Sequence, residues 1–169
     1  MNEKTVKPFG LKDKIGYMFG DFGNDFTFMF SSTFLMVFYM KVLGISAGAV
    51  GTLFLVARFV DAFTDVTMGR IVDTCKPGRD GKFKRWIRIM AGPVALASFL
   101  MYQSALADAS MTVKMIYMYA TYILWGSICY TGINIPYGSM ASAITDVPEE
   151  RTALSTFRSI GATLAQLII

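Results

Sequence analysis

Long runs without a charged residue constrain the fold of this chain more than any other feature. A transmembrane helix needs about 20 predominantly apolar residues, and two of the runs reach or pass that length. The chain is 54% apolar and only 17% charged, whereas soluble domains carry about 25% charged residues. The sequence therefore predicts an all-α, polytopic transmembrane protein. The uncharged runs are Phe26–Met40, Val42–Ala57, Ile89–Ala107, Met115–Thr145 and Ser159–Ile169.

Five membrane spans are predicted, and turn residues or charged segments separate them. An amino-terminal segment, 1–16, comes before the spans, and residues 17–169 form a partial amino-terminal helical bundle. Before the fifth span, Asp146 and Glu149 resemble a capping box, and Pro148 suits a first helical turn. The sequence ends inside the apolar run GATLAQLII, so we expect it to be the amino-terminal fragment of a longer protein. The predicted spans cover residues 17–42, 47–72, 86–107, 113–140 and 147–169.

Lysine and arginine residues are concentrated at one end of the predicted spans. Only Lys41 and Lys114 lie at the opposite end. Because loops rich in Lys and Arg stay in the cytoplasm, we expect a cytoplasmic amino terminus in the cytoplasmic (inner or plasma) membrane. Topology and anionic lipid headgroups account for the basic charge, so no nucleic-acid partner is predicted. The residues at the basic end are Lys4, Lys7, Lys12, Lys14, Lys76, Arg79, Lys82, Lys84, Arg85, Arg88 and Arg151.

The composition argues against an enzyme or a metalloprotein. The chain has no histidine, and its two cysteines, Cys75 and Cys129, fall in a basic loop and in a span. Neither a disulfide framework nor a metal-ligand spacing is present, and no pair of nucleophile and base is recognisable. We therefore predict no catalytic residue and no cofactor.

Two acids, Asp61 and Asp65, lie one helical turn apart within the second predicted span. A charge in the hydrocarbon layer costs from about 2.5 to more than 10 kcal/mol, so such acids usually mark a functional site. Arg58 shares their helix face. A bound cation would relieve the repulsion between the two carboxylates, and protonation of one would do the same. The alternative is structural, with Asp65 paired to a basic residue near the cytoplasmic end.

Polar residues in three other predicted spans are candidates for binding. Asp25 can accept hydrogen bonds from the hydroxyls of a polar substrate, or it can be solvated with Asp21 at the membrane interface. Thr131 and Asn134 share a helix face and suit a cation, a sugar hydroxyl or an interhelical hydrogen bond. Arg158 lies too deep to reach water easily, so it should pair with an acid from another span or with substrate.

Three segments carry a resemblance to a known family. They are YMFGDFGNDF, the stretch GTLFLVARFVDAFTDVTMGRIVD followed by GKFKRW, and YTGINIPYGSMASAIT. Together they resemble the glycoside–pentoside–hexuronide:cation symporters, a branch of the major facilitator superfamily. The resemblance covers essentially the whole chain. It implies a twelve-helix transporter of which these residues form the first five helices, with a site near the midplane between two six-helix halves.

The resemblance also assigns roles to individual residues. Asp61 and Asp65 match the family's cation-site acids, and Thr131 matches the cation-site threonine of melibiose permeases. Asp25 and Arg158 match sugar-contacting residues.

This sequence also departs from the melibiose-permease pattern at three positions. Asn134 replaces an acid of the joint cation and sugar site, Asn24 replaces a lysine, and Gly138 replaces a tryptophan. We expect Asn134 to contact both ligands and Asn24 to contact the sugar. The form NIPYGS looks more like the xyloside and glucuronide branches.

These observations predict a cation-coupled symporter for a glycoside, pentoside or hexuronide. The expected partners are the sugar, a monovalent cation and membrane lipid, and the sequence leaves both Na⁺ and H⁺ open as the coupling ion. One alternative is a cation-linked carrier of another amphiphile, such as a lysolipid. Another is a non-transporting membrane scaffold or sensor, in which the buried acids would all be paired and no central cavity would exist.

Overall fold

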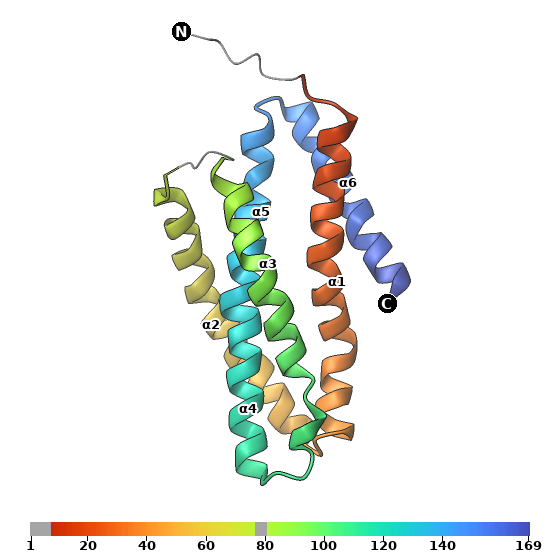
Figure 1. The fold of residues 1–169 in the computed structure, drawn as a ribbon, viewed down its shortest axis with the longest axis vertical. Helices are drawn as coiled ribbons and strands as arrows, with labels where there is room; N and C mark the ends of the chain where they lie inside the picture. Colours follow the sequence, from red (N-terminus) through yellow and green to blue (C-terminus); the bar gives the residue numbers. More distant parts are fainter. Residues whose placement is uncertain (1–7, 77–80) are drawn as a thin grey trace.

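The computed structural model describes residues 8–76 and 81–169, which form long helices packed side by side (Figure 1). Of the predicted basic residues, Lys4, Lys7 and Arg79 lie outside the described residues. A π-helical segment, η2, joins α4 to α5, so residues 111–144 form one continuous helix. The elements are α1 (Leu11–Lys41), α2 (Ala47–Thr74), α3 (Lys82–Met101), the short 3₁₀ turn η1 (Ser104–Leu106), α4 (Met111–Ile123), η2 (Leu124–Tyr130), α5 (Thr131–Ile144) and α6 (Pro148–Ile168).

The long helices lie over the ranges in which spans were predicted. Two segments, Ala47–Thr74 and Lys82–Leu106, are long and apolar enough to cross a membrane. The 111–144 helix is divided by η2 into pieces of 13, 7 and 14 residues, each shorter than a bilayer requires. That all five ranges cross the membrane stays a prediction.

The turn between α5 and α6 differs from the predicted capping box. Pro148 is the first residue of α6, as expected, but Asp146 does not cap the helix. Instead the Thr145 hydroxyl accepts a hydrogen bond from the Val147 amide at 3.1 Å. Asp146 forms an ion pair with Arg151 at 3.1 Å. The capping-box prediction is wrong because the chain is extended at Val147, which leaves the Asp146 side chain free to meet the basic residue in the first turn.

The helices alternate in direction, which brings the basic segments to one end of the molecule. The start of α1, the end of α2, the start of α3 and the turn from α5 to α6 lie together at that end (Figure 1). Lys41 and Lys114 lie at the other end, where the Lys114 ammonium donates to the Leu43 carbonyl at 2.9 Å. The charge asymmetry predicted from the sequence is therefore present in the fold.

Two packing arrangements position the interior of the bundle. Helix α1 packs mainly against α6, while α3 packs against α5 and η2, and α2 also packs against α5. The close approach of α6 to α1 depends on Gly161, because a Cβ at this position would lie 2.4 Å from the Met18 carbonyl oxygen. Small residues permit such approaches between membrane helices.

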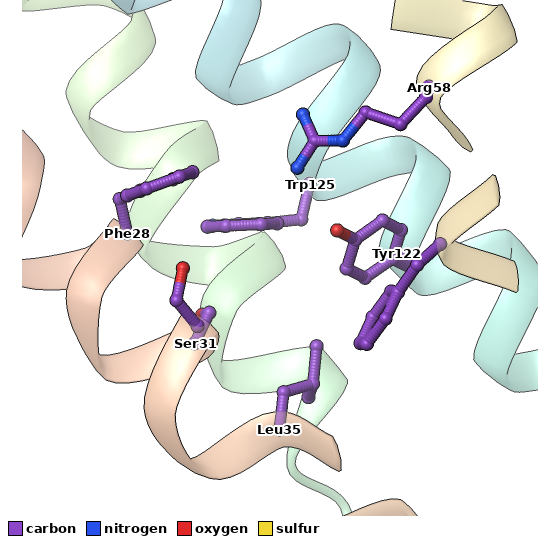
Figure 2. A pocket seen from close by; sticks show the side chains of 8 residues that line it. Phe28, Ser31, Leu35, Arg58, Tyr122 and Trp125 are labelled. Carbon is purple, nitrogen blue, oxygen red and sulfur yellow. The ribbon is translucent and has the colours of Figure 1, made fainter. Parts of the chain in front are cut away.

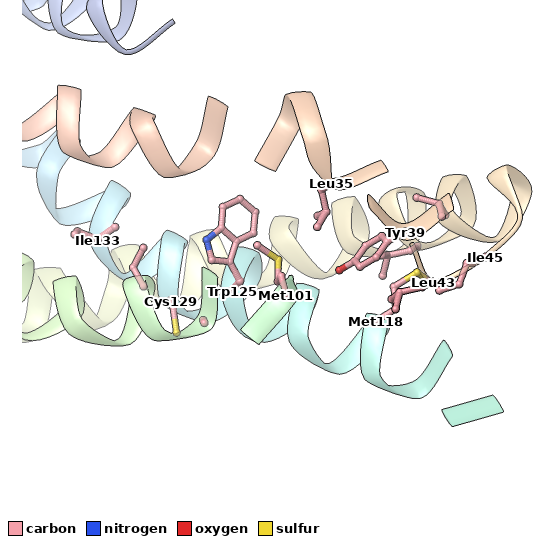
Figure 3. Packing of buried hydrophobic residues seen from close by; sticks show 13 residues of the cluster. Leu35, Tyr39, Leu43, Ile45, Met101, Met118, Trp125, Cys129 and Ile133 are labelled. Atoms are coloured by element: carbon pink, nitrogen blue, oxygen red, sulfur yellow. The ribbon is translucent and has the colours of Figure 1, made fainter. Parts of the chain in front are cut away.

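An apolar cluster closes the bundle near the α1–α2 turn (Figure 3). Tyr39, Val50, Leu53 and Met118 are fully buried in it. The turn itself needs Gly44, whose φ of 70° lies in the left-handed region that favours glycine. This cluster joins α1, α2, α3, α4 and η2 into one frame.

Large apolar side chains cover the outer face of α2. Leu55, Phe59, Phe63 and Val66 are each at least 60% exposed. Monomeric soluble proteins rarely expose contiguous apolar surface of this kind. A lipid environment or further protein would cover this face.

Candidate functional site

Asp61 and Asp65 of α2 line a cavity of about 370 Å³. The cavity lies among α1, α2, η2, α5 and α6, and its wall combines charged, amide, hydroxyl and aromatic groups. The structure thus brings together six of the seven residues predicted to bind ligands. The lining residues are Asp25, Phe28, Met29, Arg58, Asp61, Asp65, Tyr122, Trp125, Gly126, Tyr130, Thr131, Asn134 and Arg158.

Asp61 and Asp65 each receive a hydrogen bond from a hydroxyl on the facing helix. The Ser127 hydroxyl donates to Asp61 Oδ1 at 2.6 Å, and the Thr131 hydroxyl donates to Asp65 Oδ1 at 2.9 Å. Asp61 and Asp65 are four residues apart, and so are Ser127 and Thr131. The two pairs therefore form a ladder of oxygen atoms between α2 and the η2–α5 helix.

The remaining oxygen atoms of the two acids leave the site open to a cation. Arg58 approaches Asp61 Oδ2 at 3.5 Å, but its side chain is 70% exposed, so this contact is loose. Asp65 is exposed. Carboxylate and hydroxyl oxygens are the ligands that hard cations prefer. Within residues 8–76 and 81–169, no three His, Cys, Asp or Glu side chains gather in a group that could hold a metal ion.

The predicted sugar-binding residues of α1 and α5 lie beside this ladder. Tyr130 donates to Asp25 Oδ1 at 3.4 Å, which leaves most of the carboxylate toward the cavity. Asn24 is the exception among the predicted residues, because it is buried and does not line the cavity. Its amide nitrogen donates to Asn134 Oδ1 at 3.2 Å. The structure therefore places Asn24 behind Asn134 as a support.

Arg158 of α6 reaches the cavity but pairs with an unexpected acid. Its Nε donates to Asp21 Oδ1 at 2.9 Å, and Asp21 is only 1% exposed. The alternative in which Asp21 is solvated at the membrane interface is wrong. The reason is tertiary, because the approach of α6 at Gly161 covers this turn of α1. The expectation that Arg158 pairs with an acid from another span is confirmed.

Sequence reasoning missed the π-helical segment η2 and the residues that it positions. A π turn holds more residues than an α turn, and such segments are frequent at functional sites. Here η2 carries Trp125, Gly126, Ser127 and Tyr130 to the cavity side. The one signal available was the spacing of Ser127 and Thr131, which matches that of the two acids.

A smaller, more apolar cavity of about 220 Å³ adjoins the polar one (Figure 2). It shares Phe28, Arg58, Tyr122 and Trp125 with the polar cavity. Figure 2 shows the Trp125 ring in the middle of this cavity wall with the Arg58 guanidinium above it. Trp125 thus supplies an aromatic surface near the site. The tryptophan of the melibiose-permease pattern is replaced by Gly138 in this sequence.

Most of the chain matches one family of known proteins. Residues 16–169 match the family described as MFS/sugar transport protein. The chain is 41% identical to the glucuronide carrier protein homolog of Escherichia coli (strain K12), with 89% of this chain and 32% of that protein aligned.

Two further relatives are named as transporters. The putative glycoside/cation symporter YagG of Escherichia coli (strain K12) is 40% identical, with 94% of this chain and 34% of that protein aligned. The isoprimeverose transporter of Lactiplantibacillus pentosus is 39% identical, with 93% and 32% aligned. The chain spans about a third of the length of these relatives.

Proposed function

Because the chain belongs to the MFS/sugar transport protein family, we propose that the whole protein is a cation-coupled symporter of a glycoside, pentoside or hexuronide. The family relationship makes it a membrane transport protein, and its relatives are named as transporters rather than enzymes. The observation that carries the proposal is the ladder formed by Asp61 and Asp65 with Ser127 and Thr131. It gathers anionic and hydroxyl oxygens at the wall of an open cavity.

In this proposal the ladder binds the coupling ion. A monovalent cation, Na⁺ or H⁺, neutralises part of the charge on Asp61 and Asp65, and Thr131 and Asn134 supply further oxygen ligands. Arg58 competes only weakly with the cation for the Asp61 carboxylate, because the contact between Arg58 and Asp61 is long and the Arg58 side chain is exposed. No cofactor takes part.

The sugar then binds on the α1 and α6 side of the same cavity. Asp25 accepts hydrogen bonds from sugar hydroxyls, Asn134 both donates and accepts, and Arg158 donates. Asn24 contributes by orienting the amide of Asn134. Because Asn134 belongs to both sites, each ligand favours a geometry that the other also uses, and this reciprocity is the basis of coupling.

The proposed architecture follows the family. The whole protein has twelve helices, of which residues 17–169 supply the first five spans, and the cavity is completed by the second half. The amino terminus lies in the cytoplasm, with the protein in the cytoplasmic membrane. The basic segments at the start of α1, the start of α3 and the α5–α6 turn lie at one end of the bundle, and this supports the orientation (Figure 1).

The alternative of a non-transporting scaffold fits the structure less well. That hypothesis required paired acids and no central cavity, but Asp25, Asp61 and Asp65 all line a cavity of about 370 Å³. A lysolipid carrier needs a wide apolar lateral opening. The polar wall around Arg158 and Asn134 suits a sugar better.

The decisive experiment measures uptake by the full-length protein in right-side-out vesicles. Labelled glycosides, pentosides and hexuronides are supplied with a Na⁺ gradient, a proton gradient or neither. We expect concentrative uptake with one gradient, and its loss in Asp61→Asn and in Asp65→Asn. Asp108→Asn serves as the control, because Asp108 is exposed in the α3–α4 connection. Gradient-driven accumulation that persists in both α2 variants would contradict the proposed cation site.

A further inference from the structure

The buried contact between α1 and α6 involves an acid to which the proposed transport cycle assigns no role. Asp21 Oδ1 lies 2.9 Å from Arg158 Nε, and Asp21 is 1% exposed while the Arg158 side chain is 39% exposed. The buried acid thus holds one edge of a guanidinium whose other end reaches the cavity. A charge-assisted hydrogen bond of this length is among the stronger polar contacts in proteins.

A pair of tyrosines holds the same guanidinium from a second side. Arg158 Cζ lies 5.4 Å from the centre of the Tyr137 ring, within the range of a cation–π contact. Tyr137 in turn stacks on Tyr17 with 4.6 Å between ring centres. The Tyr137 hydroxyl donates to the Tyr17 carbonyl at 2.6 Å, and the Tyr17 hydroxyl donates to the Tyr137 carbonyl at 3.4 Å. The position of the ring is therefore set by contacts to α1.

These two contacts leave a defined part of Arg158 for a ligand. Asp21 occupies the Nε edge and Tyr137 lies against the face, so the two terminal amino groups remain. Asp25 is one turn further along α1 and lines the same cavity. Within the described residues, Arg158 forms its ion pair with Asp21 and not with Asp25. The chain thus supplies one acid to hold the arginine, while the second acid, Asp25, accepts a hydrogen bond from Tyr130 and forms no ion pair with Arg158.

We propose that Asp21 is a positioning residue for sugar binding, which rests on the proposed function. By holding Arg158 Nε, it prevents the guanidinium from pairing with Asp25. The carboxylate of Asp25 and the free amino groups of Arg158 then face the same substrate as separate acceptor and donor. Without Asp21, the two groups would neutralise each other and the cavity would lose both contacts.

The test is Asp21→Asn in the full-length transporter, because this substitution removes the charge and preserves the shape. Uptake kinetics are measured for the sugar and for the coupling ion, together with the thermal unfolding midpoint. We expect the KM for sugar to rise about ten-fold, as for the loss of a charge-assisted contact. The maximal rate and the KM for the cation should stay within about two-fold, the pattern of a lost binding interaction.

Matched controls separate positioning from a purely structural role. Asp13→Asn removes another acid of α1, one that binds the Gly10 amide at the helix start, and should leave the KM for sugar unchanged. If the Asp21→Asn protein does not reach the membrane in folded form, Tyr137→Leu and Tyr137→Phe test instead whether the position of Arg158 affects sugar binding. Leucine removes the ring beside Arg158 and should raise the KM for sugar, whereas phenylalanine keeps the ring and its stacking on Tyr17, loses only the hydrogen bond to the Tyr17 carbonyl, and should raise it less.

The outcomes distinguish this inference from the proposed function. Wild-type protein that shows no gradient-driven sugar uptake would overturn the function, and the inference with it. Wild-type uptake with an unchanged KM for sugar in Asp21→Asn would overturn the inference alone. Equal KM values in the two Tyr137 variants would do so as well. A rise in the KM for sugar in Asp21→Asn, together with a larger rise in Tyr137→Leu than in Tyr137→Phe, would support it.

Discussion

The packed end of the bundle and the polar cavity are built in opposite ways. Around the α1–α2 turn, Tyr39, Leu53 and Met118 are completely buried among apolar neighbours (Figure 3). At the cavity, Asp61 and Asp65 each accept a hydrogen bond from one hydroxyl and remain partly or largely accessible. Many apolar contacts hold the first region together, whereas a few directional hydrogen bonds hold the second.

The contrast between the packed end and the polar cavity predicts that substitutions at the packed end change stability and that substitutions at the cavity change binding. Apolar packing contributes through summed dispersion contacts, so its loss weakens the fold without changing one ligand. A hydrogen bond to a carboxylate contributes to one site, so its loss should appear in the affinity for one ligand.

The largest effect on stability should come from the packed end. Leu53→Ala removes a fully buried side chain from the apolar cluster, and we expect the free energy of unfolding to fall by about 2–5 kcal/mol. Denaturant unfolding of the purified protein in micelles measures this loss. Leu55→Ala on the same helix is the control, since Leu55 is 60% exposed. Equal losses in the two variants would show that the cluster is not the packed frame described above.

A smaller and more specific effect is expected at the oxygen ladder. Thr131→Val keeps the side-chain shape but removes the hydroxyl that donates to Asp65. Such a bond to a charged group contributes about 1.5–3 kcal/mol, so the KM for the coupling ion should change about ten-fold or more. Cation-dependent uptake measures it. Thr163→Val is the control, because its hydroxyl bonds only within α6, to the Ser159 carbonyl. An unchanged cation KM in Thr131→Val would remove this threonine from the site.

A larger side chain at the contact between α1 and α6 should lower the stability of the fold. In Gly161→Ala, the new Cβ would lie 2.4 Å from the Met18 carbonyl oxygen, and relief requires movement of a backbone. We expect a loss of about 1–3 kcal/mol in unfolding free energy, as for overpacked interiors. Gly138→Ala is the control, since no atom lies within 4 Å of a Cβ there. A thermal unfolding midpoint that drops equally in both variants would argue against close α1–α6 packing.

The smallest effect concerns the turn at the packed end. Gly44→Ala places a side chain at a φ of 70°, which costs L-residues about 1–2 kcal/mol. Nothing lies within 4 Å of the new Cβ, so backbone conformation alone should produce the loss. Gly48→Ala, four residues on and within α2, should be neutral or slightly stabilising. The thermal midpoints of the two variants report the difference, and a midpoint for Gly44→Ala at or above that of Gly48→Ala would refute the assigned backbone strain.

Much of the cavity could be predicted because it depends on helical periodicity. The spacing of Asp61 and Asp65 placed both acids on one helix face, and both line the cavity. The same argument placed Thr131 and Asn134 together. Depth in an apolar segment correctly indicated that Arg158 needs an acidic partner, but it could not indicate which acid. The roles of these residues in binding stay predictions.

The errors and omissions share a different cause. Asp21 looked like a solvated residue near a helix end, and only the approach of α6 buried it. Ser127 was not predicted as a site residue, and it contacts Asp61 because η2 directs its side chain toward α2. The predicted capping box at Asp146 failed because a neighbouring hydroxyl was better placed. The outcomes for Asp21 and Ser127 depended on a second segment whose position no local pattern records, whereas the outcome for Asp146 depended on the backbone conformation of its own turn.

Local sequence patterns were sufficient to predict which segments are apolar helices, which end of the bundle is basic and which helix faces carry acids. These properties follow from composition and from 3.6 residues per turn, and they need no knowledge of neighbouring segments. The tertiary structure decided which acid each polar group meets, because a hydrogen bond depends on ångström distances between helices. Those distances are set by small residues such as Gly161 and by the π turn of η2, whose effects appear only when the helices pack.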